Sequence, residues 1–492
     1  MNRKTRLSRV DRSRRIVVGA IAVILVAGWA PAQAGAAGGA VATVSAASPI
    51  ALTVTPAKAT VGAFVQVQAA GLPAGTPVDL GWETVNGGWV TRDYYHFGGK
   101  QFSETTQSLG RFQTGNDGQL FAEFRVPEDY GGMHNIVAVQ DGVQLGQGAL
   151  DLTQSFEMVP QEGPVGTPIE IRAKGLGWQT MESIWVLNWD NREVGWVSGI
   201  SSRGSAVSRF RATGPVGDHA LKLYTGYMGQ AYLNHEQAPT AYLPRPEFVF
   251  RTTPGGEVPT AYAEPYVPQP VPATTSSGAV DFQITPTQGP VGTQATLVAS
   301  GFAATQSLSL VWQTMVGSRV SGTGFEPRER TLGMLQTGPD GRLNTTITVP
   351  DDLGGLHALI LRAGDHDVAT TFYVVETSIV SMSPASGPVG TNVTIHLKGV
   401  GWTEYDNIYT ATYDNAYMGY ACGFNSQGDV VINFTASGQA GVHLIDLYPG
   451  LYDGPREGQL LYRLPQLTYA DDHPGNRIPA LRFAFLVTDT RD

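Results

Sequence analysis

Four Gly-x-His triplets hold residues whose type could do acid–base or metal chemistry. Histidine changes charge near neutral pH and binds metals through either ring nitrogen. Each triplet stands at the head of an apolar, strand-like stretch in a different repeated module, so the four cannot converge on one metal or substrate. We therefore expect each histidine to bond the backbone of a neighbouring loop. The triplets are Gly132-Met133-His134, Gly217-Asp218-His219, Gly355-Leu356-His357 and Gly441-Val442-His443.

A second set of polar residues could bind a hard cation through oxygen atoms. An aromatic residue followed by Asp-Asn occurs at Trp189–Asn191 and again at Tyr413–Asn415. Calcium needs about six to eight oxygen ligands, and no further acidic cluster lies nearby in the sequence. Asp and Asn also form turns by bonding their own backbone, which is our expectation at both places. The acid pairs Asp351-Asp352 and Asp471-Asp472 are expected to be solvated loop residues, and we predict no metal and no cofactor.

No catalytic signature accompanies these residues. The single cysteine, Cys422, falls inside an expected strand and is predicted to be a buried, inert thiol, with an intermolecular disulfide as the alternative. The sequence contains no Gly-x-Ser-x-Gly, no His-Glu-x-x-His and no phosphate-binding glycine loop. We therefore predict that the protein is not an enzyme.

The strongest candidate for a binding site is a loop rich in aromatic rings. The segment between Trp82 and Leu109 is seven residues longer than its internal counterpart between Trp312 and Leu332. A role in folding should persist in both copies, whereas the rings occur in only one. Exposed rings stack on sugars or bury into a partner, so we interpret the loop as a ligand-binding site. The alternative is a hairpin that folds its rings back onto its own domain. The residues are Trp89, Tyr94, Tyr95, His96 and Phe97.

These residues are carried by modules that recur along the chain. Gly-Pro-Val-Gly occurs at Gly163–Gly166, Gly289–Gly292 and Gly387–Gly390, with a weaker copy at Ala59–Gly62. Each copy opens a stretch such as Asn392–Leu397, in which apolar and polar residues alternate as in a half-buried strand. Short strands separated by turn residues, without helical periodicity, indicate an all-β sandwich fold.

The modules form two similar pairs. Leu109–Leu120 matches Leu332–Leu343 at eight of twelve positions with an offset of 223, and the two aromatic-Asp-Asn triplets are offset by 224. We predict domain 1 over residues 49–155, domain 2 over 156–251, domain 3 over 280–377 and domain 4 over 378–492. The intervening residues 252–279 are proline-rich and favour an extended polyproline-II spacer.

The start of each module resembles a known family. Pro-x-x-Gly-Pro-x-Gly-Thr, an alternating strand and then Gly-x-Gly-aromatic resemble the opening of IPT/TIG domains, an immunoglobulin-like family. The pattern is good at 160–178 and 384–402, partial at 286–302 and poor at 56–72, and covers about the first fifth of each module. The resemblance implies four tandem immunoglobulin-like β-sandwich domains of about seven strands each, arranged as a duplicated two-domain unit. Such domains are frequent in tandem on extracellular bacterial proteins, and the resemblance implies no activity.

The N-terminal residues predict export. A basic segment over 1–15, an apolar run from Ile16 to about Ala30 and Ala32-Gln33-Ala34 follow the order of a secretory signal peptide. The apolar run is shorter than the ~20 residues that a membrane-spanning helix needs. We predict a signal peptide over 1–34, a disordered leader over 35–48, and no membrane span after cleavage. The predicted location is extracellular or at the cell surface.

The charge of the remaining chain limits its partners. Residues 1–15 hold seven of the 32 Lys and Arg and one of the 42 Asp and Glu, which leaves 25 basic against 41 acidic residues, a net charge of −16. Such a surface repels phosphate backbones, so no nucleic acid partner is expected. We predict a secreted or cell-surface structural or interaction protein whose partner is a polysaccharide or protein of the envelope or matrix. The alternatives are an adhesin that binds polysaccharide or protein through the aromatic loop, and an accessory part of an extracellular enzyme system.

Overall fold

The computed structural model describes residues 49–92, 96–227, 230–265, 280–318, 324–423, 426–451, 464–475 and 478–489. The predicted signal peptide and leader lie outside the described residues. Within the described part the only helical elements are a 3-10 turn, His235–Gln237, and one helical turn, α1 (Tyr469–Asp472). None of the helices found there is long and apolar enough to cross a membrane.

Domain 2 shows the arrangement that all four domains share. Three strands form one sheet, five form the other, and β17 adds to β16. The first short strand of the larger sheet runs parallel to its neighbour, and the remaining pairs are antiparallel. Lettered in chain order, this is A-B-E opposite A′-G-F-C-C′, the strand order of an immunoglobulin-like sandwich. The sheets are β10 (Ser155–Val159), β12 (Pro168–Lys174), β15 (Ala206–Arg211); and β11 (Glu162–Gly163), β18 (Glu247–Thr252), β16 (Gly217–Tyr227), β13 (Ile184–Trp189), β14 (Arg192–Ser198), with β17 (Gln230–Ala231).

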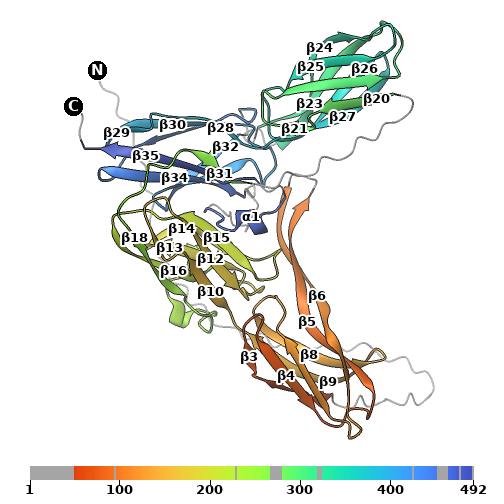
Figure 1. Ribbon diagram of the computed structural model, residues 1–492, viewed down its shortest axis with the longest axis vertical. Coiled ribbons are helices and arrows are strands. Elements are labelled where there is room, and N and C mark those ends of the chain that lie inside the picture. The colour runs from red at the N-terminus through yellow and green to blue at the C-terminus, as the bar shows by residue number, and fades with distance from the viewer. Residues whose placement is uncertain are drawn as a thin grey trace, which may run out of the picture. The chain divides into compact units, whose positions relative to one another are not determined.

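Domain 1 follows the same order, and its larger sheet carries an extended ribbon. β5 and β6 pair along their whole length, whereas β8 pairs with β5 only from Asp79 to Trp82. Beyond that point the two strands continue as a two-stranded ribbon, which Figure 1 shows in orange. The sheets are β2 (Thr53–Thr55), β4 (Phe64–Ala69), β7 (Leu120–Arg125); and β1 (Ile50–Ala51) with β3 (Lys58–Ala59), β9 (Val143–Leu152), β8 (Gly132–Gln140), β5 (Pro77–Arg92), β6 (His96–Gln113).

Domains 3 and 4 have the same strand order as domains 1 and 2. The predicted fold class of four tandem immunoglobulin-like sandwiches is therefore confirmed. Domain 3 has β20 (Asp281–Thr285), β22 (Gln294–Ser300), β25 (Leu343–Thr348); and β21 (Gln288–Gly289), β27 (His366–Val374), β26 (Gly355–Ala363), β23 (Ser307–Ser318), β24 (Gly324–Gln336). Domain 4 has β28 (Ser378–Ser383), β30 (Asn392–Lys398), β33 (Val430–Thr435); and β19 (Tyr262–Ala263), β35 (Leu481–Thr488), β34 (Gly441–Gly450), β31 (Ile408–Tyr413), β32 (Ala416–Cys422), with β29 (Ser386–Pro388) on β35.

The Gly-Pro-Val-Gly motif marks the point where the chain crosses from one sheet to the other. In domain 2, Gly166 has φ +93° and the N–H of Thr167 donates to the carbonyl of Pro164 at 3.1 Å. A hydrogen bond from the fourth residue of a turn to the first, with a positive φ at the third residue, defines a type II turn. Glycine adopts this φ without strain. The Thr167 hydroxyl adds a 2.7 Å bond to the same carbonyl. The motif therefore has a folding role in each module.

Part of the proline-rich segment between the two pairs of domains forms a β-strand. Its residues Tyr262 and Ala263 form β19, which pairs antiparallel with β35 of domain 4. The N–H of Glu264 then donates to the carbonyl of Ala480 at 2.9 Å. Residues 266–279 of the segment lie outside the described residues.

Candidate functional site

The four histidines have the structural role that the sequence predicts. In domains 1 and 3, His134 and His357 each place one ring nitrogen 2.9–3.0 Å from the carbonyl of Glu83 or Gln313. The other nitrogen of every one of the four rings lies 2.6–2.8 Å from the carbonyl four residues earlier. Each ring also stacks on a strand aromatic, with centroids 4.3 Å apart for Trp82 and His134. The ring nitrogens of all four histidines therefore contact oxygen atoms of the protein itself.

The Asp-Asn pairs form the turns that were predicted. Asp190 and Asn191 have φ +47° and +63°, as both central residues of a type I′ hairpin turn require, and they join β13 to β14. Asp190 Oδ2 also lies 2.6 Å from His219 Nδ1. The same contact joins Asp414 to His443 at 2.5 Å, and it raises the pKa of His443. No group of three or more ligands for a metal occurs in the part of the chain that the structure describes.

The expectation for the acid pairs was wrong for their second members. Asp352 and Asp472 are each only 1% exposed, whereas Asp351 and Asp471 are exposed. Asp352 accepts hydrogen bonds from Trp312 Nε1 and Thr314 Oγ1, both at 2.8 Å. A buried carboxylate that accepts several hydrogen bonds is a structural anchor, because the bonds replace the water that it loses.

Cys422 lies at the end of β32 and is half-buried rather than fully buried. It packs beside Leu353 and Trp402, a small cluster between domains 3 and 4.

The aromatic loop lies on the ribbon, and its described rings contact other domains. Phe97 is fully buried and Trp89 half-buried in a cluster with Trp196 of domain 2 and Tyr405 of domain 4. The N–H of Phe97 donates to Glu404 Oε2 at 2.6 Å. His96 is half-buried, and Tyr94 and Tyr95 lie outside the described residues. Phe97 and Trp89 therefore pack against domains 2 and 4, and the binding role of the loop stays a prediction.

Asp472 joins the ribbon to domain 2. Trp89 Nε1 lies 3.2 Å from Asp472 Oδ1 and also donates to the backbone carbonyl of the same residue. The carboxylate accepts bonds from Ser198 Oγ at 2.5 Å, from the N–H of Ile200 at 2.9 Å and from the N–H of Ser201 at 2.6 Å. Burial raises the pKa of Asp472. Three domains thus meet at one carboxylate.

The residue after Asp472 is also buried. The ring nitrogens of His473 lie 2.8 Å from Gln466 Oε1 and 2.5 Å from the carbonyl of Tyr405. Burial lowers the pKa of His473 to about 4. The ring is therefore neutral at neutral pH.

A segment of domain 4 continues the sheet of domain 2. The N–H of Trp196 donates to the carbonyl of Pro465, and the N–H of Leu467 donates to the carbonyl of Trp196, both at 2.8 Å. Leu467 and Tyr469 join the apolar core of domain 2. Backbone pairing of this kind satisfies the free edge of β14, which would otherwise expose unpaired groups.

The boundary between domains 2 and 4 also holds a network of four charged groups that we call the charge quartet: Arg211 of domain 2, Asp446 and Arg482 of domain 4, and Glu264 of the linker. The first three are buried and Glu264 is 20% exposed. Arg211 Nη2 lies 2.5 Å from Asp446 Oδ1 and 2.6 Å from the carbonyl of Phe483. Arg482 lies 3.2 Å from Asp446 Oδ2 and 2.7 Å from Glu264 Oε1. The side chains of Arg482 and Asp446 are 0% and 1% exposed. Two positive and two negative charges balance, so the burial leaves no net charge in a low-dielectric environment.

Domains 1 and 2 are joined by close backbone contacts. The Tyr130 hydroxyl donates to the carbonyl of Ile200, and the N–H of Gly131 donates to the carbonyl of Leu176 at 3.1 Å. A Cβ on Gly87 would lie 2.2 Å from the Tyr130 hydroxyl oxygen and 2.7 Å from the Ile200 carbonyl oxygen. Only glycine fits where the ribbon passes this contact.

Sequence reasoning missed the charge quartet. A signal was present, because Asp446 and Arg482 stand within the apolar runs Leu444–Tyr448 and Leu481–Val487. Charged residues in such runs are buried only when they are paired. The pairing across domains, however, leaves no trace in local periodicity.

No protein-family model matches the chain, and no curated protein matches it. Among solved structures it is similar to Salmonella α2-macroglobulin reacted with methylamine (9% identity, 87% of this chain and 30% of that chain, TM-score 0.17). It is also similar to the D1–D4 ectodomain fragment of ICAM-5 (12%, 90% and 100%, TM-score 0.17) and to invasin, a bacterial integrin-binding protein (9%, 89% and 79%, TM-score 0.18). The chain spans 30% of the length of the α2-macroglobulin. Similarities at this level carry no argument about function, and the immunoglobulin-like assignment rests on the strand order.

Proposed function

We propose that this chain is a non-enzymatic structural and interaction protein of the cell exterior, in which domains 1, 2 and 4 are joined into one preassembled unit. The charge quartet is the observation that carries the proposal. Burying Arg211, Asp446 and Arg482 costs several kcal/mol for each ion unless the charges are paired. A loose string of domains would leave these groups in water, so their burial favours a lasting contact between domains 2 and 4.

The other contacts favour the same role. The ribbon of domain 1 inserts Phe97 and Trp89 between domains 2 and 4, and β19 ties the linker to domain 4. The IPT/TIG resemblance of residues 160–178 and 384–402 supports a module that spaces or links other components outside the cell. The predicted signal peptide supports secretion. The partner class stays as predicted, a polysaccharide or protein of the envelope or matrix.

Small-angle X-ray scattering of the full chain tests the preassembled unit. We expect the double variant Arg211→Ala/Asp446→Ala to have a larger radius of gyration than the unaltered protein, because domain 4 separates from domain 2. The matched control Arg362→Ala/Glu329→Ala removes an ion pair at the surface of domain 3, with a 3.0 Å separation, and should leave the radius unchanged. An unchanged radius in the first variant would show that the domains are not held together by the charge quartet.

Fractionation of the producing cell tests the location. Antibody detection in the medium or on intact cells is expected, and a protein found only in the cytosol would exclude a role outside the cell.

A further inference from the structure

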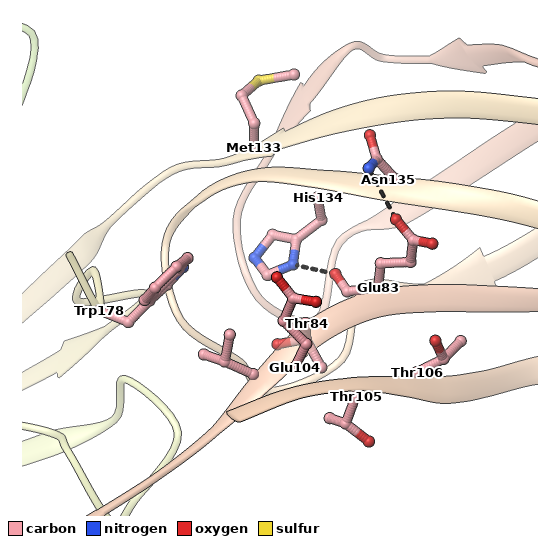
Figure 2. A pocket seen from close by; sticks show the side chains of 10 residues that line it. Glu83, Thr84, Glu104, Thr105, Thr106, Met133, His134, Asn135 and Trp178 are labelled. Carbon is pink, nitrogen blue, oxygen red and sulfur yellow. Dashed lines mark hydrogen bonds between the residues drawn. The ribbon is translucent and has the colours of Figure 1, made fainter. Parts of the chain in front are cut away.

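A groove between domains 1 and 2 is lined mainly by polar side chains. Its volume is about 410 Å³, within the range of about 300–1,000 Å³ that small-molecule sites occupy. Figure 2 shows the lining side chains of β5, β6 and β8 on one side and Trp178, from the loop after β12, on the other. Its lining includes Glu83, Thr84, Glu104, Met133, Asn135 and Trp178.

The strand register places two carboxylates on the same face of the ribbon. Val85 pairs with Glu104, and Glu83 pairs with Thr106. Glu83 and Glu104 are therefore diagonal neighbours, a relationship that separates side chains by roughly 7–8 Å. Asn135 of β8 donates to Glu83 Oε2 at 2.8 Å, which fixes that carboxylate. No hydrogen bond joins Glu104 to any described residue, so its oxygens are available to a ligand.

Thr84, which stands between Glu83 and Val85 on β5, carries a hydroxyl that is closed off from solvent. Thr84 is only 8% exposed, and its Oγ1 has no hydrogen-bond partner among the described residues. Its counterpart in domain 3, Thr314, lies 2.8 Å from Asp352 Oδ1 and 3.2 Å from Gln427 Nε2. At the position of Gln427, domain 2 has Arg203, whose guanidinium bonds Asn86 at 2.9 Å instead. Because this oxygen is closed off from solvent and side chains alternate along a strand, the Thr84 hydroxyl lies out of reach of a ligand beside Glu83.

The wall opposite the ribbon is an indole ring. Trp178 is half-buried, and its ring centroid lies 5.8 Å from that of Phe102 on β6. Met133, 68% exposed, adds an apolar side chain at the rim. His134 contributes only its ring surface, because its two ring nitrogens lie 2.9 Å and 2.6 Å from backbone carbonyl oxygens.

We propose that this groove binds a short stretch of neutral glycan, an inference that rests on the interaction role proposed above. Sugar hydroxyls donate to the carboxylates of Glu83 and Glu104. The apolar face of a sugar ring packs on the Trp178 indole, which offers apolar area with a polar edge. No Lys or Arg lines the groove, so phosphorylated or acidic sugars lack a counter-charge. The two carboxylates would also attract a cationic peptide, so oligolysine is the competing ligand in the test.

The second pair of domains supplies an internal comparison. The counterparts of Glu83, Glu104, Met133 and Asn135 are Gln313, Pro327, Leu356 and Ala358, as the paired strand registers show. The aromatic wall is retained as Trp402, which is only 8% exposed. Domain 3 thus keeps the strand register and the indole and lacks both carboxylates, as expected if the carboxylates serve a ligand rather than the fold.

Isothermal titration of the full chain with maltohexaose, cellohexaose and mannohexaose tests the proposal. At least one of these neutral glycans should bind. Glu104→Gln, and separately Glu83→Gln/Asn135→Ala, which installs the domain 3 residues, should each weaken that binding at least tenfold. The control Glu326→Gln, on β24 of domain 3, should bind as the unaltered protein does. Circular dichroism melting curves that match between variants exclude a loss through misfolding.

Three outcomes would overturn the proposal: no binding of any of the three hexasaccharides, binding that Glu104→Gln leaves unchanged, or binding of oligolysine in place of glycans. The scattering experiment above does not involve these residues. A failed titration with an intact unit would therefore reject the groove alone, and a failed scattering test would reject the role of the charge quartet alone.

Discussion

The indole nitrogen of Trp89 lies 3.2 Å from Asp472 Oδ1, although the two residues are 383 positions apart in the chain. This contact places the ribbon of domain 1 against α1 of domain 4, while the same carboxylate bonds Ser198 and Ser201 of domain 2. A single side chain thus reports on the contact of three domains. Its neighbour Asp471 is exposed and forms an ion pair with Arg209 at 2.7 Å. The two adjacent aspartates therefore form a matched pair for experiment.

Replacing Asp472 with asparagine should open this contact. The amide has one acceptor oxygen where the carboxylate has two, so N–H and O–H donors of domain 2 lose their partners, at about 1–3 kcal/mol each. Hydrogen exchange followed by mass spectrometry should show faster exchange at Ile200 and Ser201. The control Asp471→Asn removes a surface ion pair worth about 1 kcal/mol or less and should leave that exchange unchanged. Equal exchange in both variants would contradict the assigned role of Asp472.

Two Asp-Asn turns with the same backbone differ in what they contact. Asn191 and Asn415 have φ +63° and +59°, a conformation that glycine also adopts without strain. Asn415 Nδ2 in addition donates to the carbonyl of Arg211 at 2.7 Å, across the boundary between domains 4 and 2. Asn191→Gly should therefore change the free energy of unfolding by only a few tenths of a kcal/mol, whereas Asn415→Gly should cost about 1–3 kcal/mol. Urea denaturation followed by tryptophan fluorescence measures both, and equal values would show that the interdomain bond contributes nothing.

The sequence is sufficient to predict what depends on local pattern. Alternation in Asn392–Leu397, the turn at Asp190 and the contact of His134 with loop backbone all follow from neighbours in the chain or in the same sandwich. It is insufficient for Phe97 and Asp472, whose burial depends on which domain surfaces meet. Asp471 and Asp472 are chemically identical and adjacent, yet one is exposed and the other buried. Only the tertiary contact with Ser198 and Ser201 distinguishes them.

Truncating Phe97 separates a structural role of the ribbon from a ligand-binding role. The ring is fully buried beside Trp196 and Tyr405, so Phe97→Ala should destabilise the contact by about 3–5 kcal/mol, as for other buried rings. Phe121→Ala, at a ring 67% exposed on β7 of domain 1, serves as the control and should have little effect. Thermal unfolding followed by calorimetry measures both. An unaltered melting profile for Phe97→Ala would favour the ligand-binding hypothesis for the loop.

The stability of the contact should fall in acid because His473 is buried in its neutral form. Its pKa is about 4 in the folded protein, against about 6.5 for an unperturbed histidine. Between these values the unfolded chain binds more protons, so the contribution of His473 to stability is fully present above pH 6.5 and is lost as the pH falls toward 4. The size of this loss is on the order of 3 kcal/mol, since one pKa unit corresponds to about 1.36 kcal/mol.

Two buried aspartates have the opposite effect on stability in acid, so a variant is needed to measure the contribution of His473 alone. Burial raises the pKa of Asp472, and raises that of Asp406 to about 6, so these groups bind protons more readily in the folded state and favour it in acid. Their effect cancels when the unaltered protein is compared with His473→Gln, which cannot titrate. Urea unfolding between pH 7 and pH 4 should show a steeper loss of stability in the unaltered protein than in the variant. Parallel pH profiles would mean that His473 takes up its proton without leaving the buried contact with Gln466 and Tyr405.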